Sequence, residues 1–344
     1  SEDDTRKANF ERNQENPLEA DVVIIDEMSM VDIQLFQALL KAILPGTRLI
    51  LVGDVDQLPS VGPGQVLRDL MNSRAFSTVT LEKIFRQAGQ SDIVVNAHRI
   101  NRGEQITLDN KSKDFFLLER NDVNVIYKHM IQLIQDMLPR YVGATSFDIQ
   151  VLTPMRKGSL GCETLNEILQ RYLNPADPHK KEHAYGNTVF REGDKVMQIK
   201  NNYDITWSKE KEQGAGIFNG DIGTIIEIKK AIGMLKIDFD GRICNYPSTA
   251  LEQLELAYAA TVHKSQGSEF DVVILAVLGG YDKLYYRNLL YTAVTRAKKM
   301  LIIVGSTQRV KYMIDNNRRT LRYTLLKNML LIDRSKELDV DDEI

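Results

Sequence analysis

The chain has 344 residues, 43% of them hydrophobic and 26% charged, which is the composition of a globular protein of two or three domains. Its formal net charge of -3 excludes an overall basic field, so any nucleic-acid contact must come from a local site. The spacing of Cys162 and Cys244 fits neither a disulfide framework nor a metal site. Without an apolar run of membrane-span length or a signal peptide, we expect a soluble, cytoplasmic protein with no membrane partner.

The first regular pattern is the β-branched run at 20–27, ADVVIIDE, which predicts a strand buried on both faces and ending in two carboxylates. Residues 29–32 resemble a capping box, and apolar residues at helical spacing then continue until Pro45 and Gly46. A second buried strand is expected at 48–54. The succession of strand, helix and strand predicts an α/β sheet.

The same alternation continues along most of the chain. Between about 183 and 256 the apolar period changes to two, with turn residues between the runs, which predicts an inserted β-barrel or β-sandwich. The other expected elements are helices near 92–101, 123–142, 162–173 and 288–299, strands at 148–154, 269–277 and 300–305, and a helix from Arg318 onward. We therefore predict a first domain at 1–85, a second at 86–182 with 257–344, and the insertion at 183–256.

Asp26 and Glu27 follow the first strand directly, and ligands of such sheets bind at the carboxyl ends of the strands. One carboxylate can hold a hydrated magnesium ion, while the other orients and deprotonates an attacking water. For an isolated pair, a simple surface ending of the strand is the more frequent explanation. The loop at 53–64 follows the second strand, and Gln57 in it can hydrogen-bond a γ-phosphate; its alternative is an ordinary turn.

Five segments in chain order resemble motifs II to VI of the superfamily 1 helicases. They are DEMSMVD, GDVDQLPSVG, IFRQ, TVHKSQGSEFD and YTAVTRAK. The DQLPSVG loop, the HKSQGSEFD segment and the FNGDIG turn at 218–223 are most similar to the RecD-like branch, which includes the RecD subunit of exonuclease V. The resemblance spans about residues 20 to 305, and five motifs in order are far more specific than one.

The resemblance implies an α/β fold with two RecA-like domains of the P-loop NTPase type, the first incomplete, and a small SH3-like β-barrel inserted at 183–256. It implies an ATP-dependent helicase that moves 5′ to 3′ on single-stranded DNA in DNA repair or recombination, with ATP and Mg²⁺ as cofactors. Single-stranded DNA and tailed duplex DNA are the implied partners, and RecB- and RecC-type subunits are further candidates.

The resemblance also implies roles at the nucleotide. Asp26 would bind Mg²⁺ through water, Glu27 would activate the attacking water, and Gln57 would sense the γ-phosphate. The motif IV and motif VI arginines would neutralise charge on that phosphate, whereas an arbitrary arginine is usually a solvated surface residue. The residues concerned are Asp26, Glu27, Gln57, Arg86 and Arg296, with Gly267 and Glu269 at the nucleotide edge.

For DNA, the resemblance points to hydroxyl, imidazole and cationic donors that would contact phosphates. They are Thr153, Arg156, Thr261, His263 and Lys264. For His263, DNA contact and local hydrogen bonding both remain open, whereas a role as catalytic base is not expected because the family uses the motif II carboxylate.

No GxxxxGK[ST] string occurs in the chain, although ATP hydrolysis by such a motor requires this phosphate-binding loop. We therefore expect a piece of a longer protein that hydrolyses ATP negligibly by itself. The alternative function is a non-motor nucleic-acid-binding subunit of an exonuclease V type complex. Two further alternatives keep the motor: an RNA helicase and a conjugative relaxase-helicase.

Overall fold

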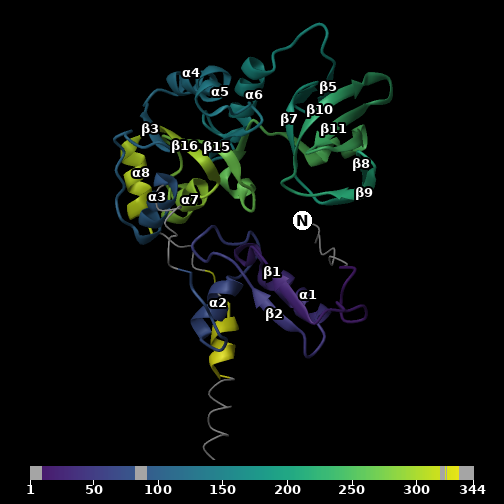
Figure 1. Ribbon diagram of the computed structural model, residues 1–344, viewed down its shortest axis with the longest axis vertical. Helices are drawn as coiled ribbons and strands as arrows, with labels where there is room; N and C mark the ends of the chain where they lie inside the picture. Colours follow the sequence, from purple (N-terminus) through teal and green to yellow (C-terminus); the bar gives the residue numbers. More distant parts are fainter. Residues whose placement is uncertain (1–9, 82–90, 318–321, 323, 333–344) are drawn as a thin grey trace, which may run out of the picture. The chain divides into compact units, whose positions relative to one another are not determined.

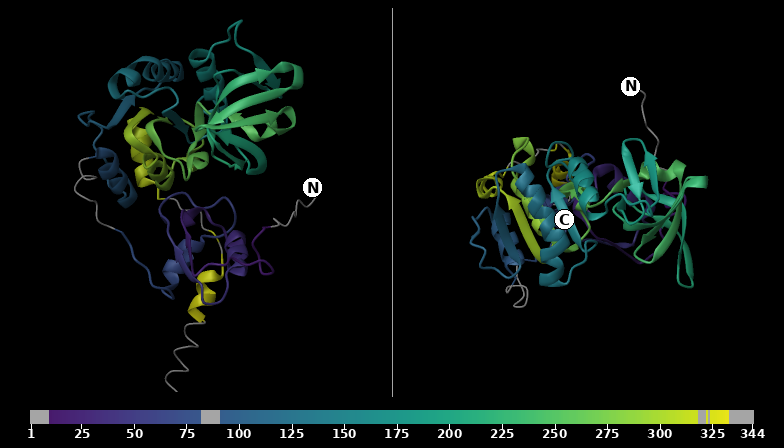
Figure 2. Two further views of the ribbon diagram at one scale, coloured as in Figure 1. Left: turned by 45° about the vertical axis from the view of Figure 1, so that its right-hand side comes forward. Right: turned by 90° about the horizontal axis from the view of Figure 1, so that it is seen from above.

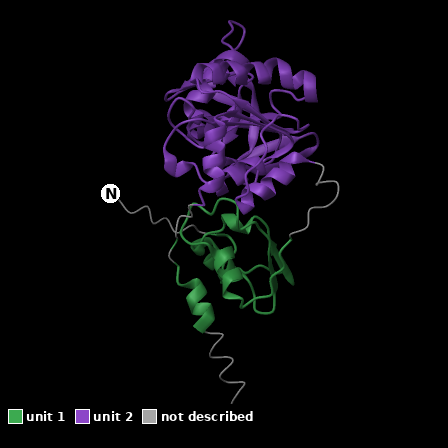
Figure 3. Ribbon diagram, turned by 90° about the vertical axis from the view of Figure 1, so that its left-hand side faces the viewer, with its two compact units in different colours: residues 1–84, 318–344 green, residues 85–317 purple. Residues whose placement is uncertain are grey.

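The computed structural model describes residues 10–81, 91–317, 322 and 324–332. The chain divides into two compact units, residues 1–84 with 318–344 and residues 85–317 (Figure 3). In the described residues, no helix is both long and apolar enough to cross a membrane.

The first unit contains a two-stranded parallel sheet with helices packed on it. Its elements are β1 (Val22–Ile25), α1 (Ile33–Ala42), β2 (Arg48–Leu51) and α2 (Val66–Ser73). The prediction that the first strand is buried on both faces is wrong, since Val22 is 45% and Ile24 63% exposed. Ile25 instead packs against the core of this unit, because the described helices cover only one face of the sheet.

Helix α1 begins later than the capping pattern predicted. Ser29 lies in a 3-10 turn, and the N-cap is Asp32, whose Oδ1 accepts a hydrogen bond of 2.8 Å from Leu35 N. The extended backbone at Asp32 supports the cap, since an N-cap residue lies outside the helical region. A Cβ on Gly62 would lie 1.9 Å from Asp32 Oδ2, so only glycine fits where the 53–64 loop crosses this cap.

The described residues 324–332 lie within the first unit, whereas the sequence analysis assigned them to the second motor domain. Arg322 donates to Ser60 Oγ at 3.3 Å and to the Gly64 carbonyl at 3.1 Å. The helix at 326–332 lies beside α2 (Figure 1), and Leu326 and Leu330 pack against the core of this unit. The apolar spacing predicted a helix from Arg318 onward, and in the described residues it runs over 326–332; residues 318–321 and 323 lie outside them. Packing decided which unit this helix belongs to.

The second unit is built on a five-stranded parallel sheet with strand order β14-β4-β15-β16-β3. Helices α4, α5 and α6 lie on one face and α3, α7 and α8 on the other (Figures 1 and 2). The bounds are α3 (Asp92–Arg102), β3 (Phe115–Glu119), α4 (Val123–Gln132), α5 (Leu138–Val142), β4 (Ile149–Thr153), α6 (Cys162–Leu173), β14 (Ala259–Thr261), β15 (Phe270–Val277), α7 (Arg287–Val294), β16 (Ala297–Gly305) and α8 (Thr307–Asp315).

The sequence predicted most of these elements, but not all of them. Strands β3 and β14 and helix α8 were not predicted, and neither was α2 of the first unit. The helix expected at 288–299 ends at Val294, and Ala297–Lys299 form the start of β16. Ala297 pairs with Phe270 of β15, so pairing with the neighbouring strand overrides the local helical preference of this segment.

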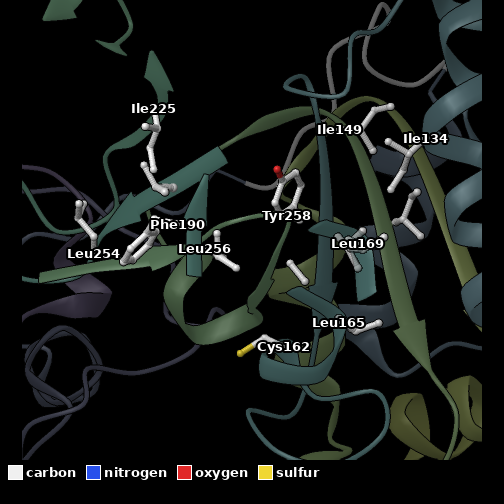
Figure 4. Close-up of a cluster of buried hydrophobic side chains, with 14 of the residues drawn as sticks. Ile134, Ile149, Cys162, Leu165, Leu169, Phe190, Ile225, Leu254, Leu256 and Tyr258 are labelled. Atoms are coloured by element: carbon white, nitrogen blue, oxygen red, sulfur yellow. The ribbon is translucent and has the colours of Figure 1, made fainter. Parts of the chain in front are cut away.

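The predicted insertion is an antiparallel β domain within the second unit. Its strands are β5 (Glu182–Tyr185), β6 (Thr188–Arg191), β7 (Lys195–Gln198), β8 (Asn202–Lys209), β9 (Glu212–Ile217), β10 (Ile222–Lys229), β11 (Met234–Phe239), β12 (Arg242–Pro247) and β13 (Leu254–Leu256). Seven of them form one sheet in the order β13-β7-β10-β11-β12-β8-β9, and β5 pairs with β6. One hydrophobic core joins this domain to the parallel sheet. Figure 4 shows Tyr258 between Phe190 and Ile225 of the β domain and Ile149 and Leu169 of the α/β layers.

A buried carboxylate, Asp194, fastens the β domain to helix α6. Its Oδ1 accepts from Asn174 Nδ2 at 2.8 Å and from the Tyr258 hydroxyl at 2.9 Å. Its Oδ2 accepts from Gln170 Nε2 at 2.6 Å and from Arg191 N at 2.7 Å. Burial raises the pKa of this carboxyl, and the four donors favour the ionised form.

Replacing Asp194 by alanine is expected to lower the free energy of unfolding by about 3 kcal/mol or more, because several buried donors lose their acceptor at once. Denaturant unfolding of the variant measures this loss. Asp204→Ala, which removes an exposed carboxylate in the same β domain, is the matched control. Equal stability of the two variants would show that the Asp194 network contributes little.

Lys195 follows Asp194 and is buried at the same junction. Its ammonium donates to the carbonyls of Phe147 at 2.8 Å and Ile149 at 3.1 Å.

Burial lowers the pKa of Lys195 to about 7, against the opposing attraction of Asp148. Between about pH 7 and the ordinary lysine pKa of 10.5, the unfolded chain binds more protons at this site than the folded chain, so stability rises with pH. We expect Lys195→Met to flatten this rise in unfolding curves measured at several pH values, and an unchanged rise would contradict it.

Candidate nucleotide and nucleic-acid sites

The two carboxylates of motif II lie at the carboxyl end of β1. Asp26 is exposed, and its Oδ1 accepts a hydrogen bond of 2.7 Å from the backbone N–H of Glu27. Glu27 is half-buried and adopts a left-handed conformation with φ of +51°, which non-glycine residues rarely do. Such conformations persist only where the surrounding structure holds them in place, and they cluster at functional sites. Strand β1 ends at Ile25, and both carboxylates lie in the turn that follows it.

The motif III loop packs directly on this turn. A Cβ on Gly53 would lie 2.9 Å from Met28 N and 3.1 Å from Ser29 N, so glycine permits the close approach of the two chains. Met28 N also donates to the Val52 carbonyl at 2.9 Å. The loops that follow β1 and β2 therefore lie together at one edge of the sheet, as expected for two parallel strands.

Asp54 organises the loop that carries Gln57. Its Oδ1 accepts from Asp56 N at 2.9 Å, and its Oδ2 lies 3.4 Å from Gln57 Nε2. Asp56 in turn lies 3.7 Å from the guanidinium of Arg68 on α2. The side-chain amide of Gln57 is thus held by its own loop in this conformation.

At this edge of the sheet, Asp26 offers one carboxylate ligand to a magnesium ion. No cluster of three or more His, Cys, Asp or Glu side chains that could hold a metal ion occurs within the described residues. An exposed carboxylate such as Asp26 still suits Mg²⁺, which keeps several waters and usually takes one or two carboxylates plus phosphate oxygens. The donor chemistry therefore fits a magnesium ion that arrives with a nucleotide.

Arg296 of motif VI is buried and bonded to motif V. Its Nη1 donates to the Ser268 carbonyl at 3.1 Å, and its Nε donates to the Thr292 carbonyl at 3.2 Å. Phe270 N donates to the Arg296 carbonyl at 2.8 Å, which adds a backbone link between the two motifs. The other implied arginine, Arg86, lies outside the described residues.

Gly267 and Glu269 belong to the same motif V segment. Gly267 has a φ of +74°, so the turn requires a residue without a side-chain penalty in the left-handed region. Glu269 is exposed, and its Oε2 lies 3.2 Å from Lys298 Nζ. The turn is therefore tied to β16 as well as to Arg296.

Strand pairing brings the predicted DNA residues from two distant segments together. Thr153 at the end of β4 is paired in register with Thr261 at the end of β14. The loop with Arg156 follows β4, and the 3-10 turn with Lys264 follows β14. The residues of the LTPMRKG and TVHKSQG segments thus meet at the carboxyl ends of adjacent parallel strands.

One of these DNA assignments needs correction. Thr153 has no exposed surface, and its hydroxyl donates to the Leu160 carbonyl at 2.6 Å. A buried hydroxyl with this bond does not reach a phosphate, so Thr153 shapes the loop that presents Arg156. The sequence pattern could not separate these two roles, since both place a hydroxyl at the end of a strand.

The motif V turn begins with Thr261, whose Oγ1 accepts a hydrogen bond of 3.3 Å from Lys264 N. The hydroxyl therefore acts as a cap for the turn in this conformation. His263 is an exposed residue, yet desolvation by the surrounding protein lowers the pKa of its imidazole below the usual value of 6.5. The ring is uncharged at neutral pH, which suits a hydrogen-bonding role.

Two carboxylates that the sequence analysis missed accompany the cations. Glu255 of β13 bonds to both Lys264 and Arg156, and Glu163 of α6 bonds to Arg156. The hydrogen bond to Glu163 and the charge of Glu255 raise the pKa of the Arg156 guanidinium. Arg156 and Glu255 are far apart in the chain, so no local spacing could have revealed their contact.

Models of three protein families match the chain in succession. They are described as an AAA domain (residues 5–119), an ATP-dependent RecD-like DNA helicase SH3 domain (165–239) and a UvrD-like helicase C-terminal domain (256–304). The second of these overlaps the predicted insertion.

Curated relatives match over most of the chain. It is 36% identical over 297 residues to the ATP-dependent RecD2 DNA helicase of Deinococcus radiodurans, covering 86% of this chain and 38% of the relative. It is 30% identical over 332 residues to the RecBCD enzyme subunit RecD of Mycolicibacterium smegmatis, covering 93% of this chain and 56% of the relative. The chain thus spans roughly half or less of the length of these relatives.

Among solved structures, the fold is similar to a Bacteroides Pif1 helicase crystallised with ADP-AlF3 and single-stranded DNA. The TM-score is 0.51 at 18% sequence identity, and the match covers 94% of this chain and 77% of that one. This likeness concerns the fold alone. Together with the helicase motifs at the strand ends, the family models and the relatives identify the chain as a member of the RecD-like superfamily 1 helicases.

Proposed function

We propose that the chain is part of an ATP-driven DNA motor, a helicase that translocates 5′ to 3′ on single-stranded DNA in DNA repair or recombination. ATP and Mg²⁺ are its cofactors. Single-stranded DNA and tailed duplexes are its substrates, and RecB- and RecC-type subunits are candidate partners. Its site of action is the cytoplasm. The relatives named as RecD2 helicase and RecD subunit support the proposal.

The observation that carries the motor proposal is the bonded path between motifs V and VI. Lys264 and Ser265 lie in one turn, Ser268 N donates to the Ser265 carbonyl at 3.1 Å, and the Ser268 carbonyl accepts from Arg296. A group that senses the γ-phosphate is thereby joined to a group that grips DNA. A shift of Arg296 on ATP binding or hydrolysis is then transmitted to the DNA contact, as coupling through a packed network requires.

At the nucleotide, each residue has a role that its chemistry supports. Asp26 would hold a hydrated Mg²⁺ ion, which when bound would supply positive charge to the phosphates. Glu27 orients and deprotonates the attacking water, and Gln57 senses the γ-phosphate. The two arginines neutralise charge that develops during transfer, and the motif V turn touches the nucleotide edge; these residues are Arg86, Arg296, Gly267 and Glu269.

At the DNA, Arg156 and Lys264 supply the phosphate contacts, with the Thr261 hydroxyl and the neutral His263 ring as further donors. Thr153 stabilises the loop through the hydrogen bond from its hydroxyl to the Leu160 carbonyl. Contacts of this kind grip the backbone without reading the base sequence. Unwinding of duplexes with a 5′ or a 3′ single-stranded tail compares the two polarities directly, and unwinding only from a 3′ tail would contradict the proposed direction.

A non-motor nucleic-acid-binding subunit is the second candidate, and one observation favours it. The chain contains no GxxxxGK[ST] string, so nothing in its 344 residues can cradle the β- and γ-phosphates in the usual way. Such a subunit has no use for the hydrolytic set of carboxylates and arginines. A motor therefore explains more of the residues.

The deciding experiment measures ATP hydrolysis with and without single-stranded DNA for this chain and for a version extended upstream through a phosphate-binding loop. We expect DNA-stimulated turnover from the extended protein and negligible turnover from this chain. Competition between single-stranded RNA and DNA distinguishes an RNA helicase, and an upstream relaxase domain would indicate a conjugative enzyme. Binding of DNA without any turnover by the extended protein would favour the non-motor subunit.

A further inference from the structure

The two cations proposed to grip DNA are already paired with carboxylates of the same unit. Glu255 Oε2 lies 2.5 Å from Lys264 Nζ, and its other oxygen, Oε1, lies 3.4 Å from Arg156 Nη2. Glu163 Oε1 lies 2.8 Å from Arg156 Nε. The four side chains form a cluster that we call the grip cluster: Arg156, Glu163, Glu255 and Lys264.

The pairs in the grip cluster differ in strength because they differ in exposure. The side chains of Lys264 and Glu255 are 29% and 32% exposed, so water screens their attraction only in part. Arg156 is 61% exposed and Glu163 46%, so that pair is screened more strongly and contributes less. Glu255 is the carboxylate that contacts both cations.

A DNA phosphate and a carboxylate bind a lysine or an arginine by the same charge-assisted hydrogen bonds. With two cations and two carboxylates, the grip cluster carries no net formal charge, so it attracts the DNA backbone only weakly while its internal pairs are intact. A phosphate that takes Lys264 must also approach Glu255, a like charge. Binding at this site is therefore an exchange of partners.

We propose that Glu255 is a positioning residue that competes with DNA phosphates for Lys264 and Arg156 and so weakens the grip on single-stranded DNA. This inference rests on the proposed function, in which these two cations hold the backbone. In a motor, a DNA contact that forms by exchanging a carboxylate for a phosphate also breaks at little cost in free energy. The ion pair between Glu255 and Lys264 then forms again whenever the phosphate leaves, which favours release of the DNA between steps.

The test measures the affinity of the chain for a fluorescent oligo(dT) by anisotropy, over a range of salt concentrations. Glu255→Gln keeps the size of the side chain and a hydrogen-bond acceptor but removes the charge. We expect it to tighten binding by about 2- to 5-fold, the range of one partly screened ion pair. Lys264 and Arg156, once free of Glu255, neutralise DNA phosphates and so release counterions from the DNA. The dependence of affinity on salt therefore becomes steeper, by up to about 0.7 in slope per cationic side chain.

Two matched variants separate this effect from a general change of charge. Glu252→Gln removes the same charge three residues earlier, where the carboxylate pairs with Lys200 at 3.4 Å and does not contact Arg156 or Lys264 in the grip cluster. We expect it to change affinity much less than Glu255→Gln does. Glu163→Gln releases only the Arg156 pair, so its effect should lie between the two. Equal tightening by Glu252→Gln and Glu255→Gln would overturn the inference.

Lys264→Ala distinguishes failure of this inference from failure of the proposed DNA site. If Lys264→Ala weakens binding but Glu255→Gln leaves it unchanged or weaker, the site stands and the competition is refuted. If Lys264→Ala leaves binding unchanged, the cations do not grip DNA, and both proposals fall. A purely structural role for Glu255 predicts weaker binding in Glu255→Gln, which is opposite in sign to the expected gain.

Discussion

In the protein extended through a phosphate-binding loop, replacing Arg296 by alanine is expected to reduce DNA-stimulated ATP hydrolysis by about 10³-fold or more, the usual contribution of an arginine that neutralises a γ-phosphate. The variant also loses the bond from the guanidinium to the Ser268 carbonyl. We therefore expect hydrolysis to become less sensitive to DNA as well as slower. Steady-state turnover with and without single-stranded DNA measures both effects.

The buried position of Arg296 calls for a control on folding, because its guanidinium also bonds to the Thr292 carbonyl. Arg296→Lys keeps the positive charge but cannot reproduce the planar fork, so it should not restore turnover. Thermal unfolding and DNA binding of both variants show whether the unit remains folded. A folded Arg296→Ala variant with less than a tenfold loss of turnover would reduce Arg296 to a structural connection between motifs V and VI.

Glu27→Gln is expected to reduce turnover of the same protein by about 10²-fold or more, because an amide cannot accept the proton of the attacking water. Nucleotide binding and DNA binding should persist, since the variant keeps the shape of the side chain and leaves Asp26 intact. Measurement of the turnover number beside the affinities for ATP and DNA separates the chemical step from binding.

The matched control for this prediction is Glu19→Gln, which makes the same change at an exposed residue just before β1. It should leave turnover unchanged. We expect the glutamine variant to keep the left-handed backbone seen at Glu27, so its stability should differ little from that of the unmodified protein. Turnover near the level of the unmodified protein in Glu27→Gln would remove this residue from the catalytic set.

The grip cluster and the Asp194 network show two uses of buried or partly buried carboxylates in one unit. Asp194 is enclosed by neutral donors and holds the β domain to α6. Glu255 contacts two cations at a surface that a polyanion is proposed to visit. The first carboxylate has no reason to exchange its partners, whereas the second does.

The sequence by itself determined the order of elements and the candidate sites at the strand ends. The bounds of α6 were predicted to the residue, and the β-branched runs predicted β1, β2, β4 and β15. Local patterns suffice there, because apolar periodicity and carboxylates after a buried strand reflect interactions within or directly beside one element. The five motifs in order also identified the family.

Only the tertiary structure decided which distant residues meet. The pairing of Thr153 with Thr261 buried one hydroxyl and made the other a cap. Core packing places the helix at 326–332 in the first unit, and the fold of the second unit brings Glu255 to Arg156. The physical reason is that burial, partner choice and pKa depend on neighbours brought by strand pairing and core packing, and these neighbours lie far away in the chain.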